Sequence, residues 1–139
     1  MEETHSESEE EKKIDESIEQ ALNQLAKLES SAEDTGSQQY LQGKAGLYAE
    51  IGILYLKKNV FQKSRDYLMA ALRGFIKLED KIAIASTQGS IGSLYLTAGD
   101  YLTAKQYYSD AYQFWQDAPH LNERIATLNS LGICELNLG

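Results

Sequence analysis

The chain has 139 residues, a net charge of −8, 42% hydrophobic residues, one proline and one cysteine. This length fits one modest domain, and a composition rich in Ala, Leu, Glu and Lys favours helices over strands. The acidic balance argues against general nucleic-acid binding, because affinity for phosphates depends on clustered Lys and Arg. A single cysteine excludes an internal disulfide.

The first thirteen residues, "MEETHSESEEEKK", are almost entirely charged or polar. They offer no apolar surface to offset the entropy cost of ordering, which predicts a disordered acidic tail over residues 1–13. The segment also lacks the basic-then-apolar pattern of a signal peptide. No apolar run reaches the roughly 18 residues that a membrane span needs. The sequence therefore predicts a soluble, cytoplasmic protein that has no membrane segment.

After the tail, apolar residues recur at helical spacing and predict one amphipathic helix. This helix and the loop "ESSAEDTGS" that follows it occupy residues 14–36. The apolar stripe consists of Ile14, Ile18, Ala21, Leu22, Leu25 and Leu28.

The rest of the chain repeats itself with a period of about 40 residues, which is typical of a solenoid. The shift divides it into a first repeat (37–79), a second (80–119) and the start of a third (120–139). Three glycines align between the repeats, and apolar residues recur on either side of them. The aligned sets are Ile51, Ile91 and Leu131; Gly52, Gly92 and Gly132; Leu54, Leu94 and Cys134.

Each repeat is predicted to be a helical hairpin, with helices over about 81–98 and 102–116 in the second repeat. The turns also align, because Asn59, Gly99 and Gly139 fall in register and tolerate the left-handed conformation that closes a helix. Glycine inside a helix costs about 1 kcal/mol relative to alanine. Its recurrence at one register therefore predicts a close approach between two helices.

Nothing in the sequence points to catalysis or to a metal. The histidines, His5 and His120, lie far apart without a partner at a suggestive spacing. His120 reads as the start of a helix, and Cys134 occupies a leucine position of the repeat and reads as a core residue. With one cysteine there is no structural zinc set. We therefore expect no enzyme activity, no catalytic residue and no cofactor.

The segment "IGSLYLTAGDYLTAKQYYSDAYQFW" (91–115) resembles a tetratricopeptide repeat at Gly92, Tyr95, Ala104, Tyr108 and Ala111. Residues 51–75 match with two replacements, Ser64 and Leu68. The long period is similar to the repeats of kinesin light chains and of the cell-polarity adaptors that bind G-protein alpha subunits. The resemblance implies an all-α, right-handed superhelical solenoid of antiparallel helix hairpins.

The resemblance also implies a concave groove lined by one face of the first helix of each repeat. Its predicted residues are Gly46, Ala49, Ile53, Lys57, Ser86, Gly89, Ser93, Thr97, Asn129, Ile133 and Asn137. These mostly small side chains leave room for an extended peptide or a helix, with hydrogen bonds from Ser93 and Asn129. The alternative is that the small residues only allow the helices to pack.

The function implied is a non-catalytic protein-interaction scaffold or adaptor that binds a partner's peptide or helix. Two alternatives stay open. The helix at 14–28 is an internal ligand that autoinhibits the groove, or the chain is a regulatory or sensor segment of a longer signalling or transcription protein. The third repeat stops before its second helix, which suggests a piece of a longer repeat protein. Its helix at about 121–138 is expected to expose an apolar face and to support a homodimer.

Overall fold

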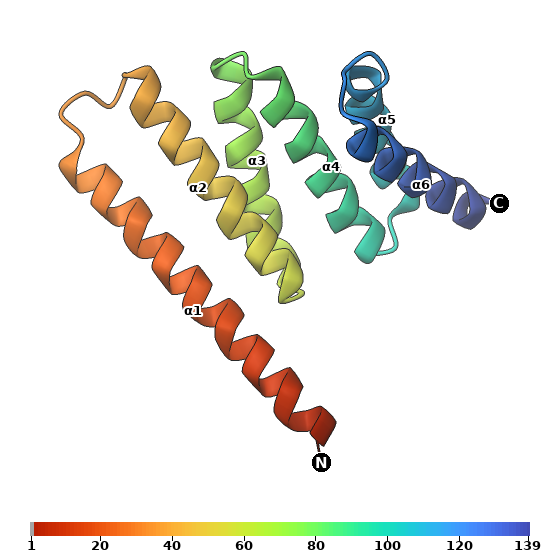
Figure 1. The fold of residues 1–139 in the computed structure, drawn as a ribbon, viewed down its shortest axis with the longest axis horizontal. Coiled ribbons are helices and arrows are strands. Elements are labelled where there is room, and N and C mark those ends of the chain that lie inside the picture. Colours follow the sequence, from red (N-terminus) through yellow and green to blue (C-terminus); the bar gives the residue numbers. More distant parts are fainter. Residues whose placement is uncertain (1) are drawn as a thin grey trace. The chain divides into compact units, whose positions relative to one another are not determined.

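A computed structural model describes residues 2–139, with side chains from Glu9 onward. These residues form six α-helices and no strand (Figure 1). The helices are α1 (Glu2–Ser31), α2 (Gln38–Lys57), α3 (Phe61–Lys77), α4 (Lys81–Thr97), α5 (Tyr101–Trp115) and α6 (Leu121–Leu138). The fold is an all-α helical-repeat solenoid, as predicted.

The chain divides into two compact units, one extending to Ala71 and the other comprising Leu72–Gly139, with the boundary inside α3. In the first unit α1 packs against α2, which forms a hairpin with α3. In the second unit α5 packs against both α4 and α6. Side-chain caps begin α2, α4 and α5: Ser37, Asp80 and Asp100 accept hydrogen bonds from the backbone N–H of Tyr40, Ala83 and Thr103.

Helix α1 starts earlier than the sequence predicted. Residues 1–13 were expected to form a disordered tail, but α1 begins at Glu2, and only residue 1 lies outside the described part. Glutamate and lysine are good helix formers, and Glu9 and Lys13 stand four residues apart, where opposite charges support a helix. Because the packed part of α1 supplies the costly nucleus, each added turn needs only propagation. The prediction considered only the burial of apolar surface and did not include helix propensity or helix propagation from the packed part of α1.

Helix α1 is held on α2 by a small apolar cluster. Ala21 and Leu25 of α1 are buried against Ile51 of α2, which is completely inaccessible to solvent. Ion pairs flank the cluster, between Asp15 and Lys58 towards one end and between Glu29 and Lys44 (3.7 Å) towards the other. Exposed ion pairs contribute little stability each. Burial of the apolar side chains therefore provides most of the attachment.

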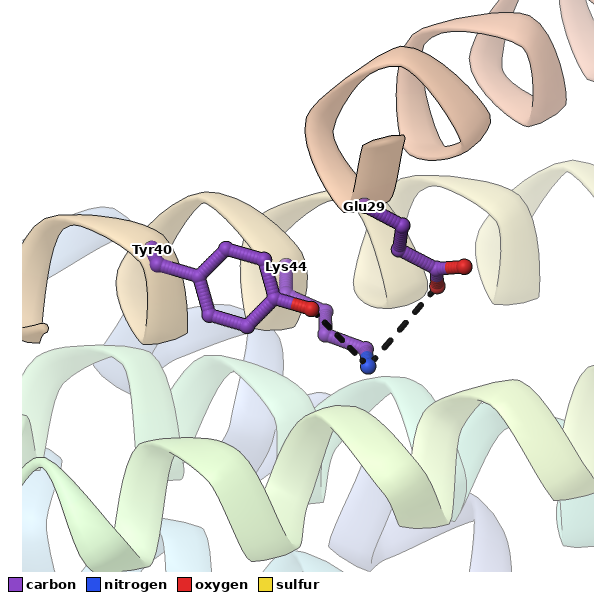
Figure 2. A network of polar contacts seen from close by, with 3 residues as sticks. All are labelled: Glu29, Tyr40 and Lys44. Atoms are coloured by element: carbon purple, nitrogen blue, oxygen red, sulfur yellow. Dashed lines mark hydrogen bonds and ion pairs between the residues drawn. The ribbon is translucent and has the colours of Figure 1, made fainter. Parts of the chain in front are cut away.

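Figure 2 shows the second of these contacts, in which Lys44 of α2 lies between Glu29 of α1 and Tyr40. The Lys44 ammonium donates to the Tyr40 hydroxyl (3.4 Å) and lies 5.6 and 5.7 Å from the ring centroids of Tyr40 and Tyr48. Desolvation alone would lower the pKa of Lys44, but the contacts with the two tyrosines outweigh it and raise the pKa. Lys44 is therefore charged at neutral pH and links the two helices.

The three aligned glycines do not all serve a close approach. A Cβ added at Gly52 would lie 2.6 Å from Leu68 Cγ, and one at Gly92 would lie 3.0 Å from the ring of Tyr108. The predicted close contact is thus present in the first two repeats. A Cβ at Gly132 would meet nothing within 4 Å. In the described part of the chain, no helix lies opposite the face of α6 that carries Gly132. Close helix packing therefore does not require a glycine at this position.

The predicted left-handed turns are confirmed. Asn59, Gly99 and Gly139 have φ values of 62°, 81° and 79°. Glu79, which was not predicted, also has a positive φ of 55°. Its backbone N–H bonds to Ile76 O and that of Asp80 bonds to Phe75 O, which repeats the pattern at Gly99 and Asp100. Glutamate is sterically strained in this conformation.

Replacing Glu79 with glycine is therefore expected to raise the free energy of unfolding by about 0.5–1 kcal/mol, because glycine adopts positive φ without a Cβ clash. The reverse change at an equivalent turn, Gly99→Ala, is expected to lower it by about 1 kcal/mol. Urea denaturation followed by circular dichroism measures both. A stability loss for Glu79→Gly would show that the glutamate side chain makes a contact that outweighs the strain.

Candidate functional site

A cavity of about 300 Å³ lies among α4, α5 and α6 in the second unit. Its lining consists of small, hydroxyl-bearing and aromatic side chains with one carboxylate: Ala85, Ser86, Gly89, Ser90, Ser93, Tyr108, Trp115, Glu123, Ala126, Thr127 and Ser130. Within α4 and α6 the lining residues recur every three or four positions, some as adjacent pairs, and the two from α5 are seven apart, which places each set on one face of its helix.

Trp115 and Tyr108 form the aromatic part of the lining and belong at the same time to the core. Trp115 is 3% exposed and packs with Ala85 and Ala111, and its ring makes edge contacts with Phe114 (4.9 Å) and His120 (5.2 Å). Tyr108 packs with Ala104 and Cys134. Because both rings are fixed by core packing, this wall of the cavity is rigid.

The hydroxyl groups in the lining are mostly engaged with the backbone of their own helices. Ser90 donates to Ser86 O (3.2 Å), Thr127 to Glu123 O (2.7 Å) and Ser130 to Ala126 O (3.0 Å). The hydroxyls of Ser93 and Tyr108 lie 2.8 Å apart and share one hydrogen bond across the α4–α5 hairpin. Each of the first three oxygens keeps lone pairs that can accept another hydrogen bond.

The predicted groove residues of the second unit are brought together only in part. Ser86, Gly89 and Ser93 line the cavity, and a Cβ built on Gly89 would meet nothing within 4 Å. The other predicted positions of this unit lie outside the lining: Thr97, Asn129, Ile133 and Asn137. Ser93, which was expected to bond a ligand, bonds Tyr108.

The predicted groove residues of the first unit lie on α2, at Gly46, Ala49, Ile53 and Lys57. They are absent from the described apolar cluster that joins α1 to α2 around Ile51. A Cβ on Gly46 would meet nothing within 4 Å, and Ile53 is 37% exposed. Helix α1 therefore packs on a different face of α2 from the one that carries these four residues.

Several lining residues were not predicted as site residues. Ala126 and Ser130 could have been found, because they stand 40 residues after Ser86 and Ser90. Tyr108 was predicted only as a position of the repeat, and Trp115 ends the segment 91–115 that carries the resemblance. Thr127 and Glu123 carry no signal in the sequence, since a polar residue on a helix surface is ordinarily solvent-exposed.

The sequence interpretations of Cys134 and His120 are confirmed. Cys134 is completely buried, and burial followed by the neighbouring Glu135 raises the pKa of its thiol. A thiol in such surroundings is a poor nucleophile. His120 is the N-cap residue of α6.

Within the residues searched, no three His, Cys, Asp or Glu side chains are grouped to hold a metal ion. Among the helices described, none combines the length and the apolar character required to cross a lipid bilayer.

Helical hairpins that recur at a fixed register, with the same glycine contact and the same turn, define a helical-repeat protein of the solenoid class. A family model described as tetratricopeptide repeat matches residues 44–117, more than half of the chain, and the chain belongs to this family. Repeats of the family generally mediate protein–protein interactions and typically form non-catalytic scaffolds. Neither the comparison with curated proteins nor that with solved structures gave a match.

Proposed function

We propose that the chain is a non-catalytic, cytoplasmic scaffold or adaptor that binds a peptide or helix of a partner protein at the predicted groove residues. The observation that carries the proposal is the cavity of the second unit, to which Ser86, Gly89 and Ser93 contribute. Small side chains on α4 leave space for a partner's side chain, and the rigid Trp115–Tyr108 wall supplies a surface for it to contact.

The open form of the cavity favours a peptide over an enclosed small ligand. Small-molecule pockets bury most of their ligand's surface, whereas this cavity is open to solvent, and its mostly apolar lining carries several hydroxyls and one carboxylate. A peptide brings donors and acceptors at regular intervals and reads such a surface through its side chains.

The test is selection of peptides of about twelve residues from a displayed random library on the wild-type chain, followed by affinity measurement on two variants. Gly89→Gln fills the cavity, and Gly132→Gln makes the same change on α6 outside it. An added Cβ meets nothing within 4 Å at either position, so both variants are expected to fold. Selected peptides should lose about tenfold or more in affinity for Gly89→Gln and keep it for Gly132→Gln. Failure to select peptides, or equal binding to both variants, would disprove the proposal.

Helix α1 is proposed to be a structural cap on α2 rather than an internal ligand of the groove. The support is its contact through Ala21 and Leu25 with Ile51, on a different face from Gly46 and Ile53.

We also propose that the chain belongs to the long-period variety of the family, since α3 and α5 begin 40 residues apart, at Phe61 and Tyr101.

A second proposal is that the chain forms a homodimer through α6. The observation that favours it is a row of exposed apolar residues at helical spacing: Leu121 (56% exposed), Ile125 (47%), Leu128 (46%) and Leu136 (84%). Burial of such a row against another molecule is favourable. Sedimentation velocity should show a concentration-dependent dimer for the wild-type chain and a monomer for the double variant Ile125→Gln/Leu128→Gln. A wild-type monomer at all concentrations would refute it.

A further inference from the structure

We propose that the cavity among α4, α5 and α6 accepts a cationic side chain, lysine or arginine, from the partner segment. This inference rests on the proposed function and specifies the chemistry of the partner. It follows from three properties of the lining: its hydrogen-bonding character, its charge and the apolar part of its wall.

Three of the lining hydroxyls present only acceptors, whereas Ser86 and the Ser93–Tyr108 pair can still donate. Ser90, Thr127 and Ser130 each spend their one hydroxyl proton on a backbone carbonyl four residues earlier. Their oxygens can then only accept further hydrogen bonds. The Ser93–Tyr108 pair uses one of its two protons internally. A ligand group rich in donors therefore matches these three oxygens and the Glu123 carboxylate, and ammonium and guanidinium groups are donors without acceptors.

The charge of the lining has the matching sign. Glu123 is the one charged residue among the described cavity residues, and its nearest basic contact is His120, at 3.9 Å from Oε2. Arg124 donates instead to the Gln116 carbonyl (3.4 Å), and Lys105 pairs with Glu135. Glu123, whose side chain is 49% exposed, thus attracts a cation and repels a carboxylate, with the modest strength of a charge pair in contact with water.

The apolar part of the wall suits the stem of a long basic side chain. Ala85, Gly89 and Ala126 line the cavity beside the Trp115 indole. Lysine and arginine bury their methylene stems along such surfaces while the charged head reaches polar groups. One side chain can therefore contact the apolar wall and Glu123 together.

The experiment uses the peptides selected on the wild-type chain and rejected by Gly89→Gln. Trp115 is the only tryptophan, so its fluorescence reports binding directly at the cavity. Replacing the shared basic residue of a selected peptide with norleucine should weaken binding about tenfold. Glu123→Gln, which keeps the side-chain shape, should weaken binding about two- to fivefold, as expected for a solvent-exposed charge pair. Glu135→Gln on the same helix serves as the control and should change it less than about twofold.

The outcomes separate this inference from the proposed function. Selected peptides that depend on Gly89 but share no basic residue, or that bind Glu123→Gln unchanged, would overturn the cationic chemistry and leave the scaffold proposal intact. A library that yields no Gly89-dependent peptide would overturn both. Displacement of the peptide by spermidine at matching concentration would show a site for free polyamines and contradict a partner side chain as the occupant.

Discussion

Replacing Gly52 with alanine is expected to destabilise the first unit by about 1–3 kcal/mol, the usual cost of overpacking a core. The added Cβ would lie 2.6 Å from Leu68 Cγ and 3.1 Å from the Leu68 backbone nitrogen. Leu68 is completely buried and cannot rotate away. Helices α2 and α3 must therefore separate, which outweighs the gain of about 1 kcal/mol in helix propensity.

The matched control is Gly46→Ala, six residues earlier on α2, where an added Cβ meets nothing within 4 Å. This change raises the helix propensity of the position without creating a clash, and it is expected to stabilise the chain by up to about 1 kcal/mol. Urea denaturation monitored by far-UV circular dichroism measures both variants. If Gly52→Ala were as stable as Gly46→Ala, the close contact between α2 and Leu68 would be wrong.

Replacing Trp115 with alanine is expected to cost about 3–5 kcal/mol, as for other large aromatic side chains removed from a core. The indole is 3% exposed and packs with Ala85 and Ala111. Its removal would enlarge the neighbouring cavity and remove the contact of the indole with Ala85, one of the contacts between α4 and α5. Because the variant has no tryptophan, circular dichroism must be used to follow its unfolding.

Two companion variants make this result interpretable. Leu102→Ala, on the same helix at a side chain that is 60% exposed, should change stability by less than about 0.5 kcal/mol. Trp115→Phe keeps an aromatic ring and should fall between wild type and Trp115→Ala. A loss below about 1 kcal/mol for Trp115→Ala would show that the indole is not part of the core of the second unit.

The repeat made most of the fold predictable from sequence. Aligned positions identified the helical hairpins, the left-handed turns at Asn59 and Gly99, and the buried places of Ile51 and Ile91. These features depend on residues close together in the sequence, and the same residues recur 40 positions later. Each repeat therefore strengthens the prediction made for the other. The same reasoning predicted a close helix contact at Gly132 that the described residues do not make. An alignment of repeats shows which residue occupies a position, but it does not show whether a helix lies opposite that position.

The candidate site was less predictable, since it depends on how α6 is rotated on α5. Ser86 and Gly89 were expected from the resemblance to the tetratricopeptide repeat, whereas Glu123 joins the cavity only because burial of Thr127 and Cys134 fixes which face of α6 meets α5. No local pattern encodes that rotation. The groove positions on α6, such as Asn129 and Ile133, therefore fell outside the lining.

The matching turns at Asn59 and Gly99 have a consequence for how such a chain can lengthen. Both close a helix with a left-handed residue and the same pair of backbone hydrogen bonds, to Leu56 and Tyr55 in one case and to Leu96 and Tyr95 in the other. An in-frame duplication of the gene segment for residues 60–99 would therefore begin and end at equivalent backbone geometry. The copy would add a helix pair without a new kind of junction, and its side chains would then be free to diverge, as Ser64 and Ala104 have done.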